Sequence, residues 1–208
     1  MALWILAGAL VGLSIVFPLG GDAREFPLPP LLLAAAFLAI GATGSLDPGV
    51  GTAGGARHGF GRGEYGYFAY PLPEPVARLR AALYPPLATV ANRWAEALGS
   101  GVQYPGTHDA FLARCRDAGQ SRPTPLLLRY GAGDYNCLHQ DLYGEHVFPL
   151  QVAILLAEPG VDFDGGEFVL TEQRPRMQSR VSVVPLRRGE HCLKLARQTR
   201  QIATPIST

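Results

Sequence analysis

Charge and cysteine are both scarce in this sequence. Charged residues make up 17% of the 208 residues, the formal net charge is +1, and there are 3 cysteines. With 48% apolar residues, the chain is not one that charge repulsion keeps disordered. The cysteines lie far apart without a C-x-x-C pair, which argues against a zinc ribbon and a disulfide framework and favours reduced thiols in the cytoplasm. A net charge near zero provides no overall field that would attract nucleic acid.

Charge is scarcest in the N-terminal quarter of the chain. Residues 1–56 carry only four charged side chains, and none of them precedes Asp22. This first uncharged run approaches the length of about 20 apolar residues that a membrane-spanning helix needs. We interpret residues 1–56 as an apolar N-terminal segment, which is either a membrane anchor acting through residues 1–46 or a spurious extension. The expected location is the cytoplasm, with membrane association in the first case.

Two helices are expected in the first part of the remaining chain. Apolar residues recur at three- and four-residue spacing over Pro75–Gly99, which predicts a helix. Pro85 and Pro86 predict a break within it, because a proline inside a helix costs about 3 kcal/mol. A second, shorter helix is expected over Asp109–Ala118, with Thr107 or Asp109 as its N-terminal cap.

After Arg122 the pattern becomes typical of strands. Apolar runs separated by glycines occur at Thr124–Tyr130, Phe148–Leu156, Glu167–Thr171 and Arg180–Leu186. The second run has no polar alternation except at Gln151, so we expect a central strand that is buried on both faces. Helices followed by short strands favour an α+β fold whose sheet closes as a barrel or a two-layered roll.

The densest polar cluster contains an H-x-D motif, formed by His139 and Asp141. In an extended segment, residues i and i+2 project to the same side, so this imidazole and carboxylate can reach one metal ion. Two histidines and one carboxylate that leave coordination positions open form the site of non-haem Fe(II) oxygenases. An H-x-D also occurs by chance, and its histidine is then a partly buried hydrogen-bonding residue.

A longer pattern surrounds this motif. A Tyr-x-x-Gly element, with Tyr130 and Gly133, precedes it. An apolar strand comes after it and is followed by Gly-Gly-Glu, at Gly165, Gly166 and Glu167. With these elements, residues 56–188 resemble the 2-oxoglutarate- and Fe(II)-dependent oxygenases of the prolyl-hydroxylase type. The long runs over residues 126–145 and 166–176 are most similar to a bacterial subfamily that is described as nucleic-acid oxygenases acting on damaged DNA.

This resemblance implies an α+β fold in which helices are followed by a double-stranded β-helix, or jelly roll. It implies that His139 and Asp141 are the first two iron ligands, and that Tyr130 lies near a carboxylate of 2-oxoglutarate. Fe(II) and 2-oxoglutarate are then the cofactors, ascorbate is a reductant and dioxygen is a substrate. The other substrate is a damaged nucleobase, or else a protein or small-molecule side chain.

The family pattern also requires a late histidine and, about nine residues after it, an arginine that binds 2-oxoglutarate. His191 and Arg200 have this spacing, but they follow Gly189 too soon, because several strands should intervene. We therefore expect residues 57–208 to be an oxygenase-like domain whose C-terminal strands are missing and whose jelly roll is incomplete. His191 and Arg200 are kept as candidate third iron ligand and candidate 2-oxoglutarate ligand.

The expected function is thus a 2-oxoglutarate- and Fe(II)-dependent dioxygenase that hydroxylates or oxidatively demethylates its substrate and is impaired in this chain. The alternative is a non-catalytic fragment of the oxygenase fold, truncated or tethered to a membrane. Iron titration distinguishes enzyme from fragment, and dependence on detergent distinguishes a tethered from an untethered protein.

Several other polar residues have both a functional and a structural interpretation. The glycine-rich run over residues 59–63, with His58 and Arg62, is either a lid or an ordinary loop. Nearby aromatic residues could stack on bases, although core packing is favoured for Tyr65, Tyr67, Phe68 and Tyr70. His146 is expected to be structural. A local basic run could bind phosphates, and it consists of Arg174, Arg176, Arg180, Arg187 and Arg188.

Overall fold

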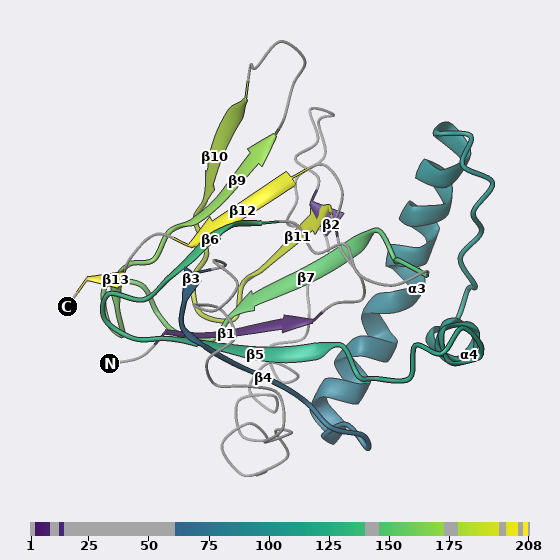
Figure 1. The fold of residues 1–208 in the computed structure, drawn as a ribbon, viewed down its shortest axis with the longest axis horizontal. Coiled ribbons are helices and arrows are strands. Elements are labelled where there is room, and N and C mark those ends of the chain that lie inside the picture. Colours follow the sequence, from purple (N-terminus) through teal and green to yellow (C-terminus); the bar gives the residue numbers. More distant parts are fainter. Residues whose placement is uncertain are drawn as a thin grey trace.

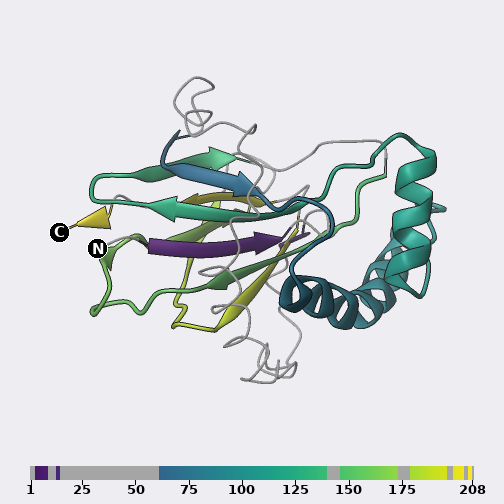
Figure 2. The ribbon, with the colours of Figure 1, turned by 90° about the horizontal axis from the view of Figure 1, so that it is seen from below.

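The computed structural model describes residues 3–8, 13–14, 61–139, 146–172, 179–195, 199–203 and 206–207. Within these ranges, two helices lie beside two antiparallel β-sheets (Figure 1). The helices are α3 (Glu74–Ala97) and α4 (His108–Asp117). Seen from below, they occupy one end of the molecule, and the sheets extend away from them (Figure 2).

Helix α3 is continuous, so the expected break at Pro85 and Pro86 is wrong. A proline removes the hydrogen bond to the carbonyl group four residues earlier. Those carbonyl groups belong to Ala81 and Ala82, which lie on the exposed side of the helix. Because water can bond to the freed carbonyl groups there, the two prolines do not end the helix.

Helix α4 begins one residue earlier than expected, and its cap is the first of the two candidates. The Thr107 hydroxyl accepts a hydrogen bond from the Ala110 N–H at 3.4 Å, which satisfies one of the free donors of the first turn. Gly119 follows the helix with a φ of 78°, a left-handed conformation that favours glycine.

The larger sheet has six strands, and β7 lies inside it. Its strand order is β2 (Leu13–Ser14), β11 (His191–Leu195), β7 (Leu150–Leu155), β1 (Leu3–Gly8), β5 (Pro125–Tyr130) and β4 (Glu64–Tyr67). Every residue of β7 is buried, which confirms the central strand predicted from Phe148–Leu156. Leu127 of β5 and Val152 of β7 belong to the same apolar core as Val76 and Leu79 of α3, so the helices pack on this sheet.

The second sheet has five strands. Its order is β10 (Arg180–Val184), β9 (Phe168–Glu172), β12 (Thr199–Ala203), β6 (Tyr135–His139) and β3 (Gly61–Arg62). A separate pair is formed by β8 (Asp164–Gly165) and β13 (Ile206–Ser207). From β5 to β7 the chain crosses from the larger sheet to the second sheet and back, and it crosses twice more between β10 and β12. A roll needs such crossings, and the jelly roll itself stays a prediction.

The two ends of the chain contribute strands to these sheets. Leu3–Gly8, expected within an apolar helical run, is strand β1 and pairs with both β5 and β7. Apart from Leu13–Ser14, the rest of the segment 1–56 lies outside the described residues. No helix in the described ranges is long and apolar enough to cross a membrane.

Strands also follow Gly189, where the roll was expected to be left open. Strand β11 pairs with β7 in the larger sheet, and β12 pairs with β6 and β9 in the second sheet. The expected incompleteness of the roll, relative to the family pattern, stays a prediction.

Candidate active site

The H-x-D motif begins at the end of strand β6. A tight turn joins β5 to β6, in which the Asp134 N–H donates to the Gly131 carbonyl at 3.1 Å and the Gly131 N–H donates to Asp134 Oδ2 at 2.8 Å. Gly133 has a φ of 77° in this turn. From there β6 runs to His139, whose Cα lies opposite Gln201 of β12.

Only the backbone of His139 is described, and Asp141 lies outside the described residues. The expectation that the two side chains share one side of a strand therefore stays a prediction, as does their role as iron ligands. The register does place His139 relative to its surroundings. Gln201 lies opposite both His139 and Leu170, and Leu170 is a buried residue of β9.

The last part of the glycine-rich run next to this turn is the edge strand β3, and the expected role of the run as a lid stays a prediction. Gly61 and Arg62 pair with Asn136 and Tyr135 of β6. A side chain at position 61 would collide with the Tyr135 carbonyl, and φ at Gly61 is 121°. Arg62 Nε lies 3.0 Å from Asp134 Oδ1, so the strand is also tied to the turn. The other member of the expected lid, His58, lies outside the described residues.

Tyr130 ends β5 as a buried residue. It packs in a small apolar cluster with Leu155, Ala157 and Phe163. Gly63 lies close to the Tyr130 ring, because a Cβ atom added at position 63 would be 2.6 Å from Cδ1 of that ring. Tyr130 therefore sits in a closely packed position, and its predicted role beside 2-oxoglutarate stays a prediction.

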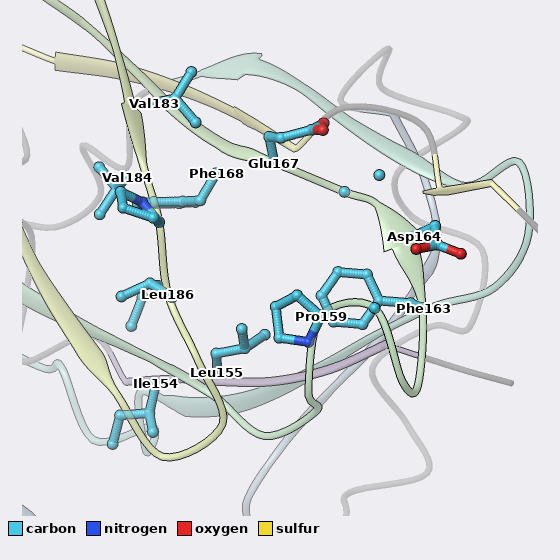
Figure 3. Close-up of a pocket in the computed structure, with 15 residues that line it drawn as sticks. Ile154, Leu155, Pro159, Phe163, Asp164, Glu167, Phe168, Val183, Val184 and Leu186 are labelled. Atoms are coloured by element: carbon cyan, nitrogen blue, oxygen red, sulfur yellow. The ribbon is translucent and has the colours of Figure 1, made fainter.

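Next to Tyr130 lies a pocket of about 330 Å³ that sequence reasoning missed. It opens between β7 of the larger sheet and the β9–β10 pair of the second sheet. Its lining is Ala153, Ile154, Leu155, Pro159, Gly160, Phe163, Asp164, Gly165, Gly166, Glu167, Phe168, Val183, Val184, Pro185 and Leu186. Figure 3 shows Phe163, Pro159 and Leu155 along one side and the carboxylates of Asp164 and Glu167 on the side of β8 and β9. The only sequence signal for it was the Gly-Gly-Glu element.

His191 and Arg200 lie in different sheets. His191 starts β11, and its Cα lies opposite Ile154, a residue of the pocket lining. Burial lowers the pKa of His191, and Glu190 partly opposes this effect, so the imidazole is neutral near pH 7. Arg200 lies in β12 opposite Thr171, and its side chain is outside the described part of the structure.

The residue types of the H-x-D motif suit Fe(II), whereas the lining of the pocket does not suit 2-oxoglutarate. An imidazole and a carboxylate in an H-x-D are donors that Fe(II) accepts. Among the described side chains, however, no group of three His, Cys, Asp or Glu residues could hold a metal ion. The described lining of the pocket has two carboxylates and no Lys, Arg or His. A dicarboxylate needs a cationic partner, so 2-oxoglutarate does not fit this lining.

In the described part of the basic run, one arginine is ion-paired. Arg188 Nη2 lies 3.1 Å from Asp162 Oδ2, and the Arg188 N–H donates to Glu158 Oε2 at 3.0 Å. The Arg187 N–H donates to Glu190 Oε2 at 2.8 Å. The carboxylate of Asp162 offsets the charge of Arg188, whereas the bond of Arg187 involves only its backbone and Arg180 is an exposed residue of β10, so the phosphate site stays a prediction. Arg174 and Arg176 lie outside the described residues.

The remaining candidates have structural positions. Phe68 is buried in the main core, which confirms the packing interpretation for this aromatic residue. Tyr70 is exposed, so core packing is wrong for this residue, and its hydroxyl accepts a hydrogen bond from Arg80. The backbone of His146 bonds with the side chain of Gln120 in both directions, at 2.8 and 3.4 Å, and the structural role expected of its imidazole stays a prediction.

Comparisons with known proteins cover most of this region. A family model described as "Oxygenase, catalysing oxidative methylation of damaged DNA" matches residues 63–205. The match continues past residue 188, where the resemblance was expected to end, and it includes His191 and Arg200.

Two uncharacterized proteins of Mycobacterium tuberculosis, from strains CDC 1551 and ATCC 25618, are each 52% identical to the chain over 122 residues. These residues are 59% of this chain and 52% of each relative, so the aligned part spans about half the length of the curated relatives. No solved structure matches the chain. Because the family match covers well over half of its residues, the chain belongs to this oxygenase family.

Proposed function

We propose that the protein is a 2-oxoglutarate- and Fe(II)-dependent dioxygenase of damaged nucleic acid whose site is impaired in this chain. The observation that carries the proposal is the family match over residues 63–205, which spans the H-x-D motif, the pocket and the strands around them. The family's description names both an oxygenase and damaged DNA as its substrate. A protein or small-molecule side chain is the second substrate class.

His139 and Asp141 would hold Fe(II), which with 2-oxoglutarate supplies the activation of dioxygen for oxidation of a C–H bond. His191 is the candidate third ligand. Its lowered pKa suits this role, since a histidine must be neutral to bind a metal. The strand register favours a site near the pocket. His191 lies opposite Ile154, which lines the pocket. His139 is paired through Gln201 with Leu170, which follows the lining residue Phe168 by two positions.

The apolar walls of the pocket would exclude water from a reacting centre. Leu155, Phe163, Phe168 and Leu186 are among the apolar residues that line the pocket. An oxygenase benefits from such walls, because a dry site limits side reactions of a strong oxidant. The same walls leave a charged cosubstrate without a partner, which is the physical reason for the proposed impairment.

The impairment follows from the two carboxylates beside the pocket. Asp164 and Glu167 would repel the dianionic 2-oxoglutarate, and no described lining residue is cationic. Arg200 would have to supply the missing charge from strand β12 of the second sheet. An arginine suits the task because its planar fork binds a carboxylate through two hydrogen bonds.

Metal binding tests the proposal separately from turnover. Fe(II) affinity would be measured anaerobically by competition with a coloured chelator, for the chain and for variants His139→Ala, His191→Ala and His146→Ala. We expect saturable binding of one Fe(II) that His139→Ala weakens by at least about 10-fold, because it removes a direct ligand. The control His146→Ala changes a histidine outside the pocket lining, and we expect it to bind like the unmodified chain.

His191→Ala tests the third ligand. Weaker binding in this variant supports a ligand role for His191, and unchanged binding assigns the third position to another group. If the unmodified chain binds no Fe(II), or if all variants bind equally well, the proposed site is wrong. The alternative, a non-catalytic truncated or membrane-tethered fragment of the oxygenase fold, would then be favoured.

A further inference from the structure

Strand β10 is an open edge of the second sheet. It pairs with β9 along all of its residues, and in the described part of the chain it has no neighbour on its other side. Figure 1 shows it beside β9 at the periphery of the molecule. The backbone N–H and C=O groups on its outer side can therefore pair with another strand.

This strand has none of the features that usually prevent such pairing. Soluble proteins protect an exposed edge with a charge within the strand, a proline or a β-bulge. In Arg180–Val184 the one charged residue is the first, and the next proline is Pro185, just past the strand. The register with β9 is regular from end to end, so no bulge interrupts this edge.

Two valines also make the edge apolar. Val181 and Val183 keep 61% and 57% of their surface exposed, and their i, i+2 spacing places them on one side of the strand. β-Branched side chains gain stability from a cross-strand partner that is β-branched or aromatic. The edge therefore favours a partner strand that carries apolar side chains.

A second copy of β10 fulfils this requirement. Antiparallel pairing centred on Ser182 aligns all residues of the strand and places Val181 opposite Val183 of the other copy, twice. Arg180 then lies opposite Val184, so no like charges face each other. The two arginines would be about 14 Å apart along the strand direction, which is beyond the screening length of physiological salt.

The charge of the whole chain favours a second copy over a charged partner. The formal net charge is +1 at pH 7, so copies of the chain do not repel each other at long range. An acidic peptide would find only Arg180 as a cationic residue on this strand. A copy of the same strand needs no such charge.

We propose that two copies of the chain associate through β10, in antiparallel register about a two-fold axis at Ser182. The second sheets of the two copies then form one continuous sheet. Such an interface uses the same surface of both copies, so it closes at the dimer. Val183 and Val184 also line the pocket, and the shared edge therefore lies beside the pockets of both copies.

Sedimentation velocity over a range of concentrations tests the association. We expect a reversible monomer–dimer equilibrium whose dissociation constant Val181→Lys raises by at least about 10-fold, since the substitution occurs twice in a symmetric interface and places a charge on the edge. The matched control is Val161→Lys. Val161 is a valine of similar exposure, 67%, outside β10, and its variant should dimerise like the unmodified chain.

Disulfide cross-linking tests the register. Ser182→Cys should form an intermolecular disulfide under mild oxidation, because directly opposed Cα atoms lie about 4.5–5.5 Å apart, within reach of a disulfide. Arg180→Cys should not, since its two Cα atoms would lie beyond the limit of about 7 Å. The unmodified chain, with its free cysteines, provides the background.

A chain that stays monomeric up to roughly 1 mM would overturn the proposal. A dimer that Val181→Lys leaves unchanged would also overturn it, because the contact would then lie elsewhere on the molecule. Equal cross-linking of the two cysteine variants would contradict the register centred on Ser182.

Discussion

Acid should destabilise this protein through His108. The side chain is buried at the start of α4, and its pKa is about 4 in the folded chain against 6.5 for an ordinary histidine. The unfolded chain therefore binds a proton at this residue before the folded chain does. The contribution to stability is complete above pH 6.5, and it is lost progressively as the pH falls from 6.5 towards 4.

The size of the effect follows from the difference in pKa. One pKa unit corresponds to about 1.4 kcal/mol, so the whole shift has a ceiling of about 3 kcal/mol. At pH 5 only part of it is lost, because the pKa of about 4 in the folded chain lies below that pH. We therefore expect a loss of about 1–2 kcal/mol between pH 7.5 and pH 5 from this residue.

Urea denaturation at both pH values measures this loss. The variant His108→Phe keeps an aromatic ring against Tyr84 but cannot be protonated, so its stability should fall by about 1–2 kcal/mol less than that of the unmodified chain. His146→Phe is the control, and it should keep the full acid sensitivity. If His108→Phe and the unmodified chain lose the same stability at pH 5, the neutral buried imidazole is not the cause and the reasoning is refuted.

Three further substitutions test the packing around the site and the helices, each by urea denaturation. Gly61→Ala should cost more than about 1 kcal/mol, because the position combines a φ of 121° with a collision at the Tyr135 carbonyl, and an unchanged midpoint would count against the β3–β6 pairing. Phe148→Ala should cost about 3–5 kcal/mol, since this ring is fully buried, and a loss below 1 kcal/mol would contradict its place in the core. Thr107→Ala should cost about 1 kcal/mol through the lost cap of α4, whereas Thr107→Ser should cost much less.

Local signals in the sequence were sufficient where neighbouring residues determine the structure. Thr107 and Gly119 bracket α4 because a cap and a left-handed stop act within one turn. The apolar run over Phe148–Leu156, with Gln151 as its one polar residue, predicted a strand buried on both faces, and β7 has that position. The buried Gln151 itself was only an interruption in the pattern, and its Oε1 atom has no hydrogen-bond partner.

Tertiary context decided the features that sequence reasoning missed. The effect of Pro85 depends on which side of α3 faces water, and no local rule contains that information. Leu3–Gly8 is an apolar run that suits a helix or a strand, and its pairing with β5 and β7 decides between them. The pocket between the two sheets depends on residues that are distant in sequence, so no single motif could indicate it.

The candidate site was predictable only as a motif. His139 and Asp141 stood out through their spacing, and the family match includes both. The position of His191 beside Ile154 required the pairing of β11 with β7, since the sequence indicated only its nine-residue distance from Arg200. The burial of Arg80 in α3 has no signature in the sequence, because an arginine on an amphipathic helix is normally expected at the surface.

Succinate release from 2-oxoglutarate tests the central claim most directly. The assay contains Fe(II), ascorbate and dioxygen, and it compares this chain, its His139→Ala variant and a Mycobacterium tuberculosis relative at equal concentration. We expect the relative to release succinate and this chain to be slower by at least roughly 10- to 100-fold, because its pocket lacks a described cationic partner for the cosubstrate. Turnover by this chain at the rate of the relative, abolished by His139→Ala, would contradict the proposed impairment, and no turnover by the relative would contradict the proposed chemistry.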